Sequence, residues 1–230
     1  SCSMQIESVF FTFWEQYIMN TIRKAGLAAS LLAVSSVASA EWSANLGFAS
    51  EYYFRGIPQK TSSASGGIDY EAGGFYAGTW AADVGDGLEV DVYGGYGFDI
   101  SEDFSLSIGG TGYFYTGDFD TEYLEVNLGA AYGIVSLDVA VGQHELDSST
   151  DEDYTYYALT VEKNGFYGTF AGFSQDWGGE YLELGYGTTV AEIDLGVSLI
   201  LCDEIDSSDL GILNESDEVV VFTIGKSFDL

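Results

Sequence analysis

Carboxylates spaced two residues apart are the groups in this chain whose type and spacing could do chemistry. Glu89 and Asp91, for example, alternate with Leu88, Val90 and Val92. A period of two places the acids on one face of a β-strand and the apolar residues on the other. Ladders of Asp and Glu favour cations and repel anions when such a face encloses water. The candidate pore-lining residues on this face are Glu51, Arg55, Asp69, Glu71, Glu89, Asp91, Glu125, Asp138, Glu183 and Asp194.

Arg55 is the one basic residue expected among these acids. It shares the parity of Glu51, so its side chain is expected to point inward and to pair with Glu51 or a neighbouring acid. Such a pair could tune the interior or only brace the fold. The scarcity of inward Arg and Lys argues against a channel for phosphates or acidic sugars. A solvated inner face without selectivity is the alternative interpretation.

Acidic residues also gather in two predicted loops, 147–152 and 203–217. Carboxylates on loops can bind divalent cations, but neither loop has the spacing of an EF-hand. The preferred interpretation is that these acids are solvated surface charge. Divalent ions could also bridge them to lipopolysaccharide. The weak Ca²⁺ or Mg²⁺ candidates are Asp203, Glu204, Asp206 and Asp209.

Catalytic chemistry has little support in the sequence. His144 is the only histidine, and its neighbour Glu145 points to the opposite face of the same strand. Ser148 and Ser149 follow, but a catalytic triad needs three convergent side chains and nothing marks a convergent set. We therefore predict that the protein is not an enzyme and has no cofactor.

The charge balance excludes one large class of partners. The net charge is −31, and Arg55, Lys60, Lys163 and Lys226 are the only bases after residue 40. Binding to nucleic acid through phosphates requires many more cations than these. With 17 Tyr and 15 Phe the chain is too aromatic to be read as disordered. Cys202 is the only cysteine after residue 40, so neither an internal disulfide nor a cysteine metal site is expected there.

The N-terminal segment indicates export. Residues 19–40 combine a short basic region, an apolar stretch too short to span a bilayer, and the small-residue pattern Ala38-Ser39-Ala40. They are predicted to be a signal peptide, with the mature chain starting at Glu41. Residues 1–18 are predicted to be a non-native or over-extended start.

The remainder, 41–230, alternates in short segments broken by Gly, Asp and Ser. We predict an all-β fold with about twelve strands, and an even number brings both termini to the same, periplasmic, side of a closed barrel. The longest connections, among them 56–65 and 203–217, all fall on the opposite side, as barrels with short periplasmic turns require. The predicted strands are 42–55, 66–72, 74–84, 88–98, 104–116, 121–132, 135–146, 153–163, 166–174, 180–190, 192–202 and 218–229.

The composition of the two faces indicates which one points outward. The non-apolar face is rich in small residues such as Gly95, Gly142 and Ser198, which suit the concave inside of a barrel and leave room for water. The opposite face carries Leu, Val, Ile and Phe, as a lipid-facing belt does. Aromatic residues near strand ends are predicted to form interfacial girdles, with ordinary sheet packing as the alternative. They are Trp42, Tyr52, Tyr132, Tyr154 and Trp177.

Several stretches resemble a known family. Ser50 to Gln59, read as SEYYFRGIPQ, is similar to the S-x-Y-x-F-R-G-x-x-Q signature of the TorF family of porins, also called Gcw_chp. The stretches 74–81, 88–96 and 122–126 and the ending Lys226-Ser227-Phe228 are similar as well. The resemblance implies an outer-membrane location and a porin role, without an established substrate. The chain departs from the pattern in Pro58 and in its last two residues, Asp229 and Leu230.

These observations predict a closed antiparallel up-and-down transmembrane β-barrel in the bacterial outer membrane. It would act as a porin-like channel for passive diffusion of small solutes, with a preference for cations. The first alternative is a closed structural or adhesive barrel whose acidic loops bind divalent cations or a partner. The second is a soluble periplasmic barrel. Expected partners are outer-membrane lipid, lipopolysaccharide and small solutes or cations, and no nucleic acid; the solute and the oligomeric state are left open.

Overall fold

The protein is an all-β molecule in the computed structural model, which describes residues 40–146, 150–208 and 210–230. No helix among these residues is long and apolar enough to cross a membrane. The predicted signal peptide and the segment before it lie outside the described residues, apart from Ala40. The strands are β1 (Glu41–Phe54), β2 (Ile57–Ala72), β3 (Phe75–Gly85), β4 (Gly87–Asp99), β5 (Phe104–Tyr115), β6 (Tyr123–Tyr132), β7 (Val135–His144), β8 (Glu152–Lys163), β9 (Phe166–Gln175), β10 (Trp177–Gly178), β11 (Glu180–Val190), β12 (Ile193–Cys202), β13 (Ile205–Ser207), β14 (Gly211–Asn214) and β15 (Asp217–Asp229).

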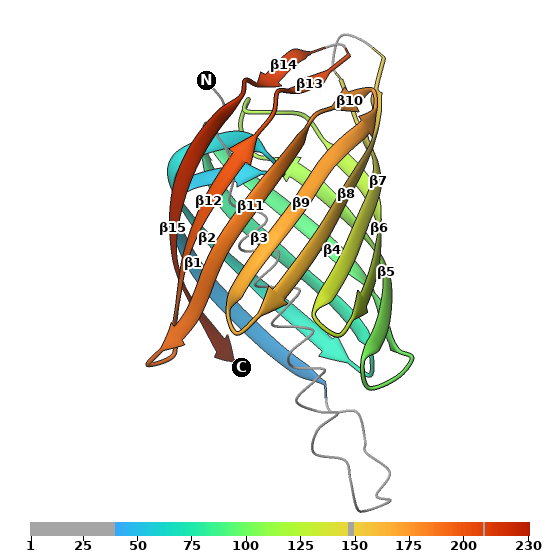
Figure 1. Ribbon diagram of the computed structural model, residues 1–230, viewed down its shortest axis with the longest axis vertical. Helices are drawn as coiled ribbons and strands as arrows, with labels where there is room; N and C mark the ends of the chain where they lie inside the picture. The colour runs from blue at the N-terminus through green and yellow to red at the C-terminus, as the bar shows by residue number, and fades with distance from the viewer. Residues whose placement is uncertain (1–39, 147–149, 209) are drawn as a thin grey trace, which may run out of the picture.

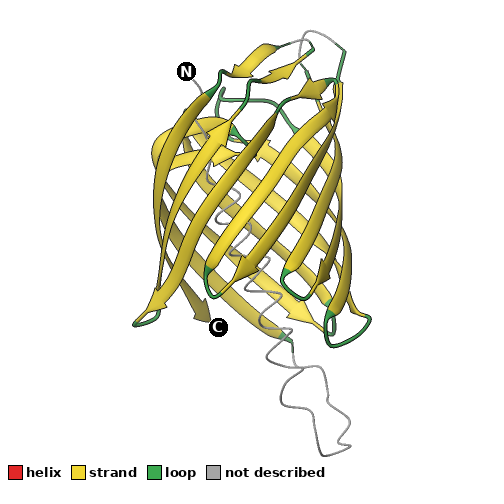
Figure 2. Cartoon of the chain, viewed as in Figure 1, coloured by secondary structure: helices red, strands yellow, loops and turns green. Residues whose placement is uncertain are grey.

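Twelve of these strands close into one antiparallel barrel, in the order β1-β15-β12-β11-β9-β8-β7-β6-β5-β4-β3-β2 (Figures 1 and 2). Each of the twelve pairs with the next barrel strand along the chain, and β1 pairs with β15 to complete the ring. Ser43 lies opposite Asp229, so the start of β1 and the end of β15 are at the same end of the barrel. We call this the terminus end. The predicted barrel, its strand number and the shared side of its termini are confirmed.

The opposite end, which we call the loop end, carries a small additional sheet. Strands β10, β13 and β14 form it, and Figure 1 shows them above the barrel wall. They come from the connections predicted as the loops 175–179 and 203–217. Trp177 pairs with Ser207, and Ser207 pairs with Gly211. These connections therefore hold ordered strands that lie over one mouth of the barrel.

Tight turns join the strands at the terminus end. Gly73 and Gly74 have φ of 59° and 88°, and Asn164 and Gly165 have φ of 55° and 83°. Positive φ at both central residues is the geometry of two-residue hairpins that match strand twist, and Asn-Gly and Gly-Gly favour it. The turn Ala191-Glu192 has the same geometry without a glycine, with φ of 52° and 63°. Lys226 donates to Glu192 over 2.9 Å, which lowers the pKa of that carboxyl.

One predicted connection is wrong. The segment 56–65 was expected to be a loop, but β2 begins at Ile57 and pairs with β1 up to Phe54. The connection is only the turn Arg55-Gly56, with φ of 47° and 88°. The polar run 59–65 concealed the strand, because Lys, Thr and Ser in alternation carry no apolar face that a periodicity argument can detect.

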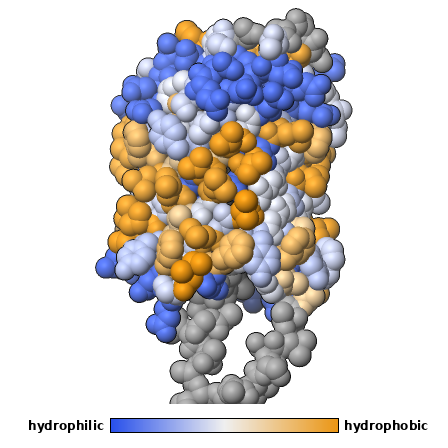
Figure 3. All heavy atoms as spheres, turned by 90° about the vertical axis from the view of Figure 1, so that its right-hand side faces the viewer, coloured by the Kyte–Doolittle hydropathy of each residue, from blue (hydrophilic) through white to orange (hydrophobic). Residues whose placement is uncertain are grey.

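The apolar face of the barrel points outward, as expected. Side chains in the middle of the strands are about half exposed on the outside, among them Leu46 at 62%, Leu124 at 60% and Val126 at 53%. Figure 3 shows a band of hydrophobic side chains on one face of the barrel, below a strongly hydrophilic loop end. A barrel with this exterior cannot hide its apolar surface from water by itself, so the belt needs an apolar surrounding.

The aromatic residues divide between a girdle and the interior. Trp42 and Tyr132 lie outside at the terminus end, where they are 53% and 67% exposed. Tyr52, Tyr154 and Trp177 were expected in a girdle, but they are buried inside, and that prediction is wrong for them. Position near a strand end does not distinguish the two faces. Tyr154 shares the inward parity of Tyr156, Tyr52 lies next to a shift in the β1–β2 register, and Trp177 belongs to the additional sheet. The aromatic residues on the outer surface at the terminus end are Trp42, Tyr70, Phe75, Tyr96, Phe98, Tyr132, Phe166 and Tyr186.

Candidate functional site

The hairpin of β1 and β2 leaves the barrel wall at the loop end. Among the described residues, β1 pairs with β15 only over Ser43–Ala49, and β2 pairs with β3 only over Ser65–Ala72. The two strands nevertheless continue to pair with each other as far as Phe54 and Ile57. The residues between, 50–64, thus form a two-stranded ribbon that has left the ladder on both sides. We call it the inward hairpin.

The tip of the inward hairpin crosses the lumen. Arg55 donates to both carboxylate oxygens of Glu125 on β6, each over 2.7 Å. Its guanidinium also lies 4.3 Å from the ring centroid of Tyr156 on β8. Around the closed ring, β6 is five steps from β1 through β2-β3-β4-β5 and seven steps through β15-β12-β11-β9-β8-β7. Arg55 therefore reaches the wall that faces its own strand.

The small sheet at the loop end holds the same tip from above. The side-chain amide of Asn214, on β14, donates to the carbonyl oxygen of Gly56 over 2.6 Å. A Cβ placed on Gly56 would overlap the side chain of Ile205 on β13 and approach a Tyr181 ring carbon to 3.1 Å. Glycine is needed here both for the positive φ and for this close approach. The tip is therefore fixed between the wall that faces β1, which we call the far wall, and the small sheet of β10, β13 and β14, which we call the cap.

Glu125 is the centre of a dense polar network. Tyr113 and Tyr154 donate their phenol groups to it over 2.9 Å each, and Asn127 donates over 2.6 Å. With the two bonds from Arg55, both carboxylate oxygens are fully engaged. A buried carboxylate is tolerated only when charge and hydrogen bonds compensate the loss of water. Arg55 and the two tyrosines supply that compensation across the lumen.

Glu89 forms a second network beside the first. It is fully buried, and it accepts hydrogen bonds from Tyr52 of the inward hairpin and, over 2.8 Å, from Tyr115 of β5. The register of β1 against β2 shifts between Tyr52 and Tyr53, and Ser62, between the partners of Ala49 and Glu51, has φ of 63°. Beside this irregularity Tyr52 and Tyr53 are both buried, and Tyr52 bonds to Glu89.

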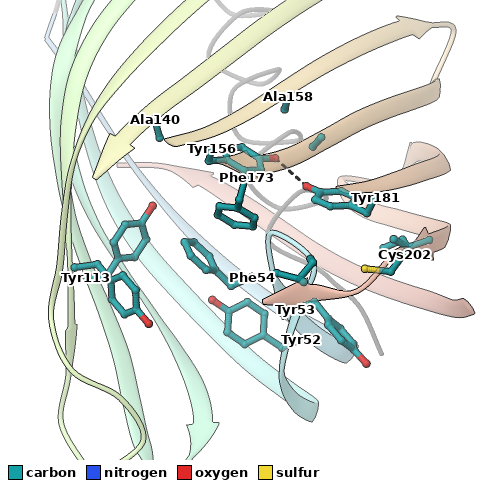
Figure 4. Close-up of a cluster of buried hydrophobic side chains, with 14 of the residues drawn as sticks. Tyr52, Tyr53, Phe54, Tyr113, Ala140, Tyr156, Ala158, Phe173, Tyr181 and Cys202 are labelled. Carbon is teal, nitrogen blue, oxygen red and sulfur yellow. Dashed lines mark hydrogen bonds between the residues drawn. The ribbon is translucent and has the colours of Figure 1, made fainter. Parts of the chain in front are cut away.

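Aromatic rings fill the space around these carboxylates. Phe54 packs edge-on against Tyr113, with centroids 5.1 Å apart, and the phenols of Tyr156 and Tyr181 are 2.8 Å apart. Figure 4 shows Tyr52, Phe54 and these rings gathered from different strands, with the tyrosine pair marked by a dashed line. The inward hairpin and the surrounding wall thus form one packed layer across the lumen.

Glycines on the inner face accommodate tyrosine rings from neighbouring strands. A Cβ on Gly142 would overlap the ring of Tyr154, and one on Gly185 would overlap that of Tyr167. Tyr167 lies against the glycine and donates to Glu183 over 2.7 Å. The small residues had been expected to leave room for water. At these positions they are instead covered by rings, which pack closely where no side chain intervenes.

Other predicted lining residues are spread along the inner face. Asp69 accepts from Tyr93 over 2.6 Å, and Asp91 is buried. Glu71 and Asp138 are partly exposed, and Asp194 accepts from Thr189 over 2.6 Å. These residues do not converge on a single point, so they form a scattered acidic lining.

Glu51 occupies a different position from the other acids. It is partly exposed and accepts from Thr61, across the inward hairpin, over 2.9 Å. Arg55 pairs with Glu125 rather than with Glu51, which the sequence had placed first. The expectation that Arg55 would pair with an acid holds, but its partner comes from the opposite wall.

The loop carboxylates form no metal centre in the part of the chain that is described. No group of three or more His, Cys, Asp or Glu side chains could hold an ion there. Asp203, Glu204 and Asp206 are exposed, and Asp209 lies outside the described residues. His144 is buried and stacks on Tyr123, with ring centroids 3.9 Å apart. Its Nε2 also lies 2.8 Å from the Thr121 hydroxyl and 3.2 Å from an Asp120 carboxylate oxygen.

Glu152 was missed by the sequence reasoning. It is buried under the small sheet and accepts from Trp177 over 2.9 Å, from Ser207 over 2.5 Å and from Ser208 over 3.0 Å. Its inward parity with Tyr154 and Tyr156 was available, but it adjoined an acidic loop and was read as surface charge. The carboxylate ties β10 and β13 to the barrel rim.

The fold and the lumen define a closed antiparallel β-barrel protein with an apolar exterior, a carboxylate-rich interior and a hairpin folded into its mouth. The chain belongs to the Gcw_chp family, described as "Bacterial protein of unknown function", whose model matches residues 33–200. None of the curated proteins matches the sequence.

Solved structures align with this chain at low sequence identity. A chain from a study of the in-meso crystallization of membrane proteins aligns with a TM-score of 0.51 and 9% identity, over 83% of this chain and 84% of that one. OccAB2 from Acinetobacter baumannii aligns with a TM-score of 0.44 and 10% identity, over 81% of this chain and 60% of its own. An anion-selective porin from Comamonas acidovorans gives 0.37 and 12%, over 84% and 100%. The first of these likenesses supports the closed-barrel fold.

Proposed function

We propose that the protein is a channel of the bacterial outer membrane for passive diffusion of small solutes, with a preference for cations. The observation that carries the proposal is the division of the barrel into an apolar exterior and a polar, acidic interior. Unpaired backbone groups cannot face hydrocarbon, and a closed barrel leaves none in its ladder. Lipid and lipopolysaccharide are then the partners of the exterior, and the porin role suggested by the TorF resemblance is part of the same proposal.

The membrane location is supported by two features of the exterior. The outward side chains at mid-strand are apolar, and aromatic residues gather outside at the terminus end. Tyr and Trp favour the level of the lipid headgroups. The chain with the similar fold comes from a study of membrane proteins, which agrees with this placement. With the predicted export signal, the terminus end would face the periplasm.

Cation preference follows from the charges of the inner face. Arg55 is the one base on that face among the described residues, and Glu125 neutralises it. Asp69 and Asp194 lie on the same face, and the side chains that hydrogen-bond to them, Asn45, Tyr93 and Thr189, are uncharged. An excess of carboxylates lowers the energy of a cation in the lumen and raises that of an anion.

Planar-bilayer recording tests the proposal. The purified protein is expected to conduct in KCl, and Asp138→Asn is expected to lower its cation preference because one lumen carboxylate is lost. Asp103→Asn, the same change in the exposed turn 100–103, is the matched control and is expected to leave the preference unchanged. Equal effects of the two variants would show that the inner carboxylates do not determine the cation preference.

A closed structural barrel is the second candidate, and one observation favours it. The inward hairpin and the aromatic residues around Arg55 form a packed layer across the lumen. A permanent layer would leave the barrel as a scaffold that presents its acidic loop end to divalent ions or a partner. Absence of conductance in folded, inserted protein, including variants without the Arg55–Glu125 pair, would favour this function over the channel.

A further inference from the structure

We propose that the inward hairpin is a gate and that the Arg55–Glu125 ion pair is the latch that holds it closed. The inference rests on the proposed channel function and names its regulation. In the structure the tip, Phe54 to Ile57, spans the lumen from β1 to the facing wall. Passage through the lumen therefore requires the tip to leave Glu125.

The hairpin is built to move as a unit. Residues 50–64 hold each other through the β1–β2 ladder, which stays intact to the turn. Their ladders to β15 and β3 end at Ala49 and Ser65, so a swing of the ribbon breaks no further ladder pairing. Two bonds at the base remain to the adjacent strands, from the Ser63 hydroxyl to the Asp83 carbonyl over 2.7 Å and from the Phe222 N–H to the Ser50 hydroxyl over 2.9 Å. The register shift at Tyr52/Tyr53 and the positive φ of Ser62 mark the point where the ribbon bends. Hinges are commonly a few residues that absorb such dihedral changes.

The hairpin forms one ion pair with the strand beside it, on the near wall, and one with the far wall, and the two pairs differ in burial. On the near side, Lys60 forms an ion pair with Asp83, and both side chains are partly exposed. On the far side, the Arg55–Glu125 pair is almost fully buried, with side-chain exposures of 8% and 0%. An exposed ion pair contributes little, whereas loss of one partner of a buried pair has a large effect. The far-wall pair is therefore the contact that decides the position of the tip.

The remaining contacts of the tip depend on the same closed position. Asn214 donates to the Gly56 carbonyl, and Tyr52 donates to Glu89. Neither group keeps its partner when the ribbon swings toward the near wall. The cap and the latch thus favour one state together, as expected of an element with two discrete arrangements.

The test is single-channel recording of Arg55→Ala, Glu125→Gln and the double variant, each in the full protein. Each single variant is expected to raise mean conductance at least about tenfold, because a lost latch shifts the population toward the open state. The double variant is expected to resemble the single variants, since both remove one interaction. Lys60→Ala is the matched control, with one cation lost from the same hairpin, and is expected to conduct like the wild type.

Two further measurements keep the outcomes distinct. Heat-modifiable gel mobility shows that each variant is folded, and amide hydrogen exchange of residues 50–64 reports release of the hairpin without any need for conduction. Faster exchange together with higher conductance supports the gate. If the wild type conducts and the folded latch variants conduct no more, the gate is refuted and the channel function stands. If no folded protein conducts although exchange rises, the channel function is refuted, and the ion pair is only a brace.

Discussion

At the scale of single residues, the stretch that carries the family resemblance builds the inward hairpin. Tyr52 donates to Glu89, Phe54 packs on Tyr113, and Arg55 binds Glu125. Gly56 allows the turn and its contact with Ile205. The signature is therefore explained by one structural task, which is to place a cation and two aromatic rings in the lumen.

The Tyr52 hydroxyl gives a prediction at this scale. Tyr52→Phe keeps the ring and removes one donor from the buried Glu89 carboxylate, so we expect a loss of about 1.5–3 kcal/mol in the free energy of unfolding. Urea unfolding of the barrel in lipid measures it. Tyr157→Phe removes a similar bond to the exposed Glu180 and is expected to change the free energy by less than about 0.5 kcal/mol. Equal losses at the two sites would contradict the importance of burial.

Residue parity predicted most inner positions and failed at the hairpin. Asp69, Glu89, Glu125 and Glu183 follow the period of two and lie on the inner face. Glu51 also fits the period of two in the sequence, but the β1–β2 pairing is irregular around it, at Tyr52 and at Ser62. The partner of Arg55 could not be predicted, because Glu125 is brought to it by ring closure rather than by any spacing along the chain.

At the scale of elements, glycine and tyrosine on adjacent strands act as pairs. Gly142 lies directly opposite Tyr154, Gly78 opposite Tyr93, and Gly95 opposite Tyr76. Each ring covers a position without a side chain, so the wall is packed from strand to strand rather than through a central core. The sequence showed the glycines but not which rings cover them, since that depends on the register between strands.

This pairing predicts the effect of a single methyl group. Gly185→Ala is expected to displace the Tyr167 ring from its bond to Glu183 and to reduce the free energy of unfolding by about 1–3 kcal/mol. Gly97→Ala is the control on the same face, because a Cβ there would lie 3.9 Å from the nearest atom, the Gly74 carbonyl oxygen, which is ordinary contact. There we expect no loss, or a gain of up to about 1 kcal/mol. Urea unfolding of both variants compares them, and a tolerated Gly185→Ala would refute the pairing.

At the scale of the whole molecule, the closed barrel followed from few features of the sequence. The alternation, the even strand number and the short turns at one end sufficed for its topology. The ordered sheet of β10, β13 and β14 and the inward hairpin were missed, because short or polar strands carry no apolar period. Features that depend on contacts across the lumen, such as the pairing of Arg55 with Glu125, could not be predicted from the sequence.

The orientation of the barrel surface gives a further prediction. Leu128, on β6, is exposed on the outside, and Leu128→Arg is expected to destabilise the barrel in a bilayer by about 2–4 kcal/mol if it lies near the midplane. Glu122→Arg, beyond the outer end of the same strand, is the control and is expected to change stability little. Unfolding in lipid vesicles measures both. An unchanged Leu128→Arg barrel would contradict the lipid-facing belt.

The reversal potential of the wild-type channel in a KCl gradient tests the central claim most directly. An acidic lumen with one neutralised arginine predicts a reversal potential shifted toward the potassium equilibrium value, and less so at high salt because added ions screen the carboxylates. A potential shifted toward the chloride value would contradict the proposed preference. Absence of any current both from the folded, inserted wild type and from its folded Arg55→Ala and Glu125→Gln variants would contradict the channel itself.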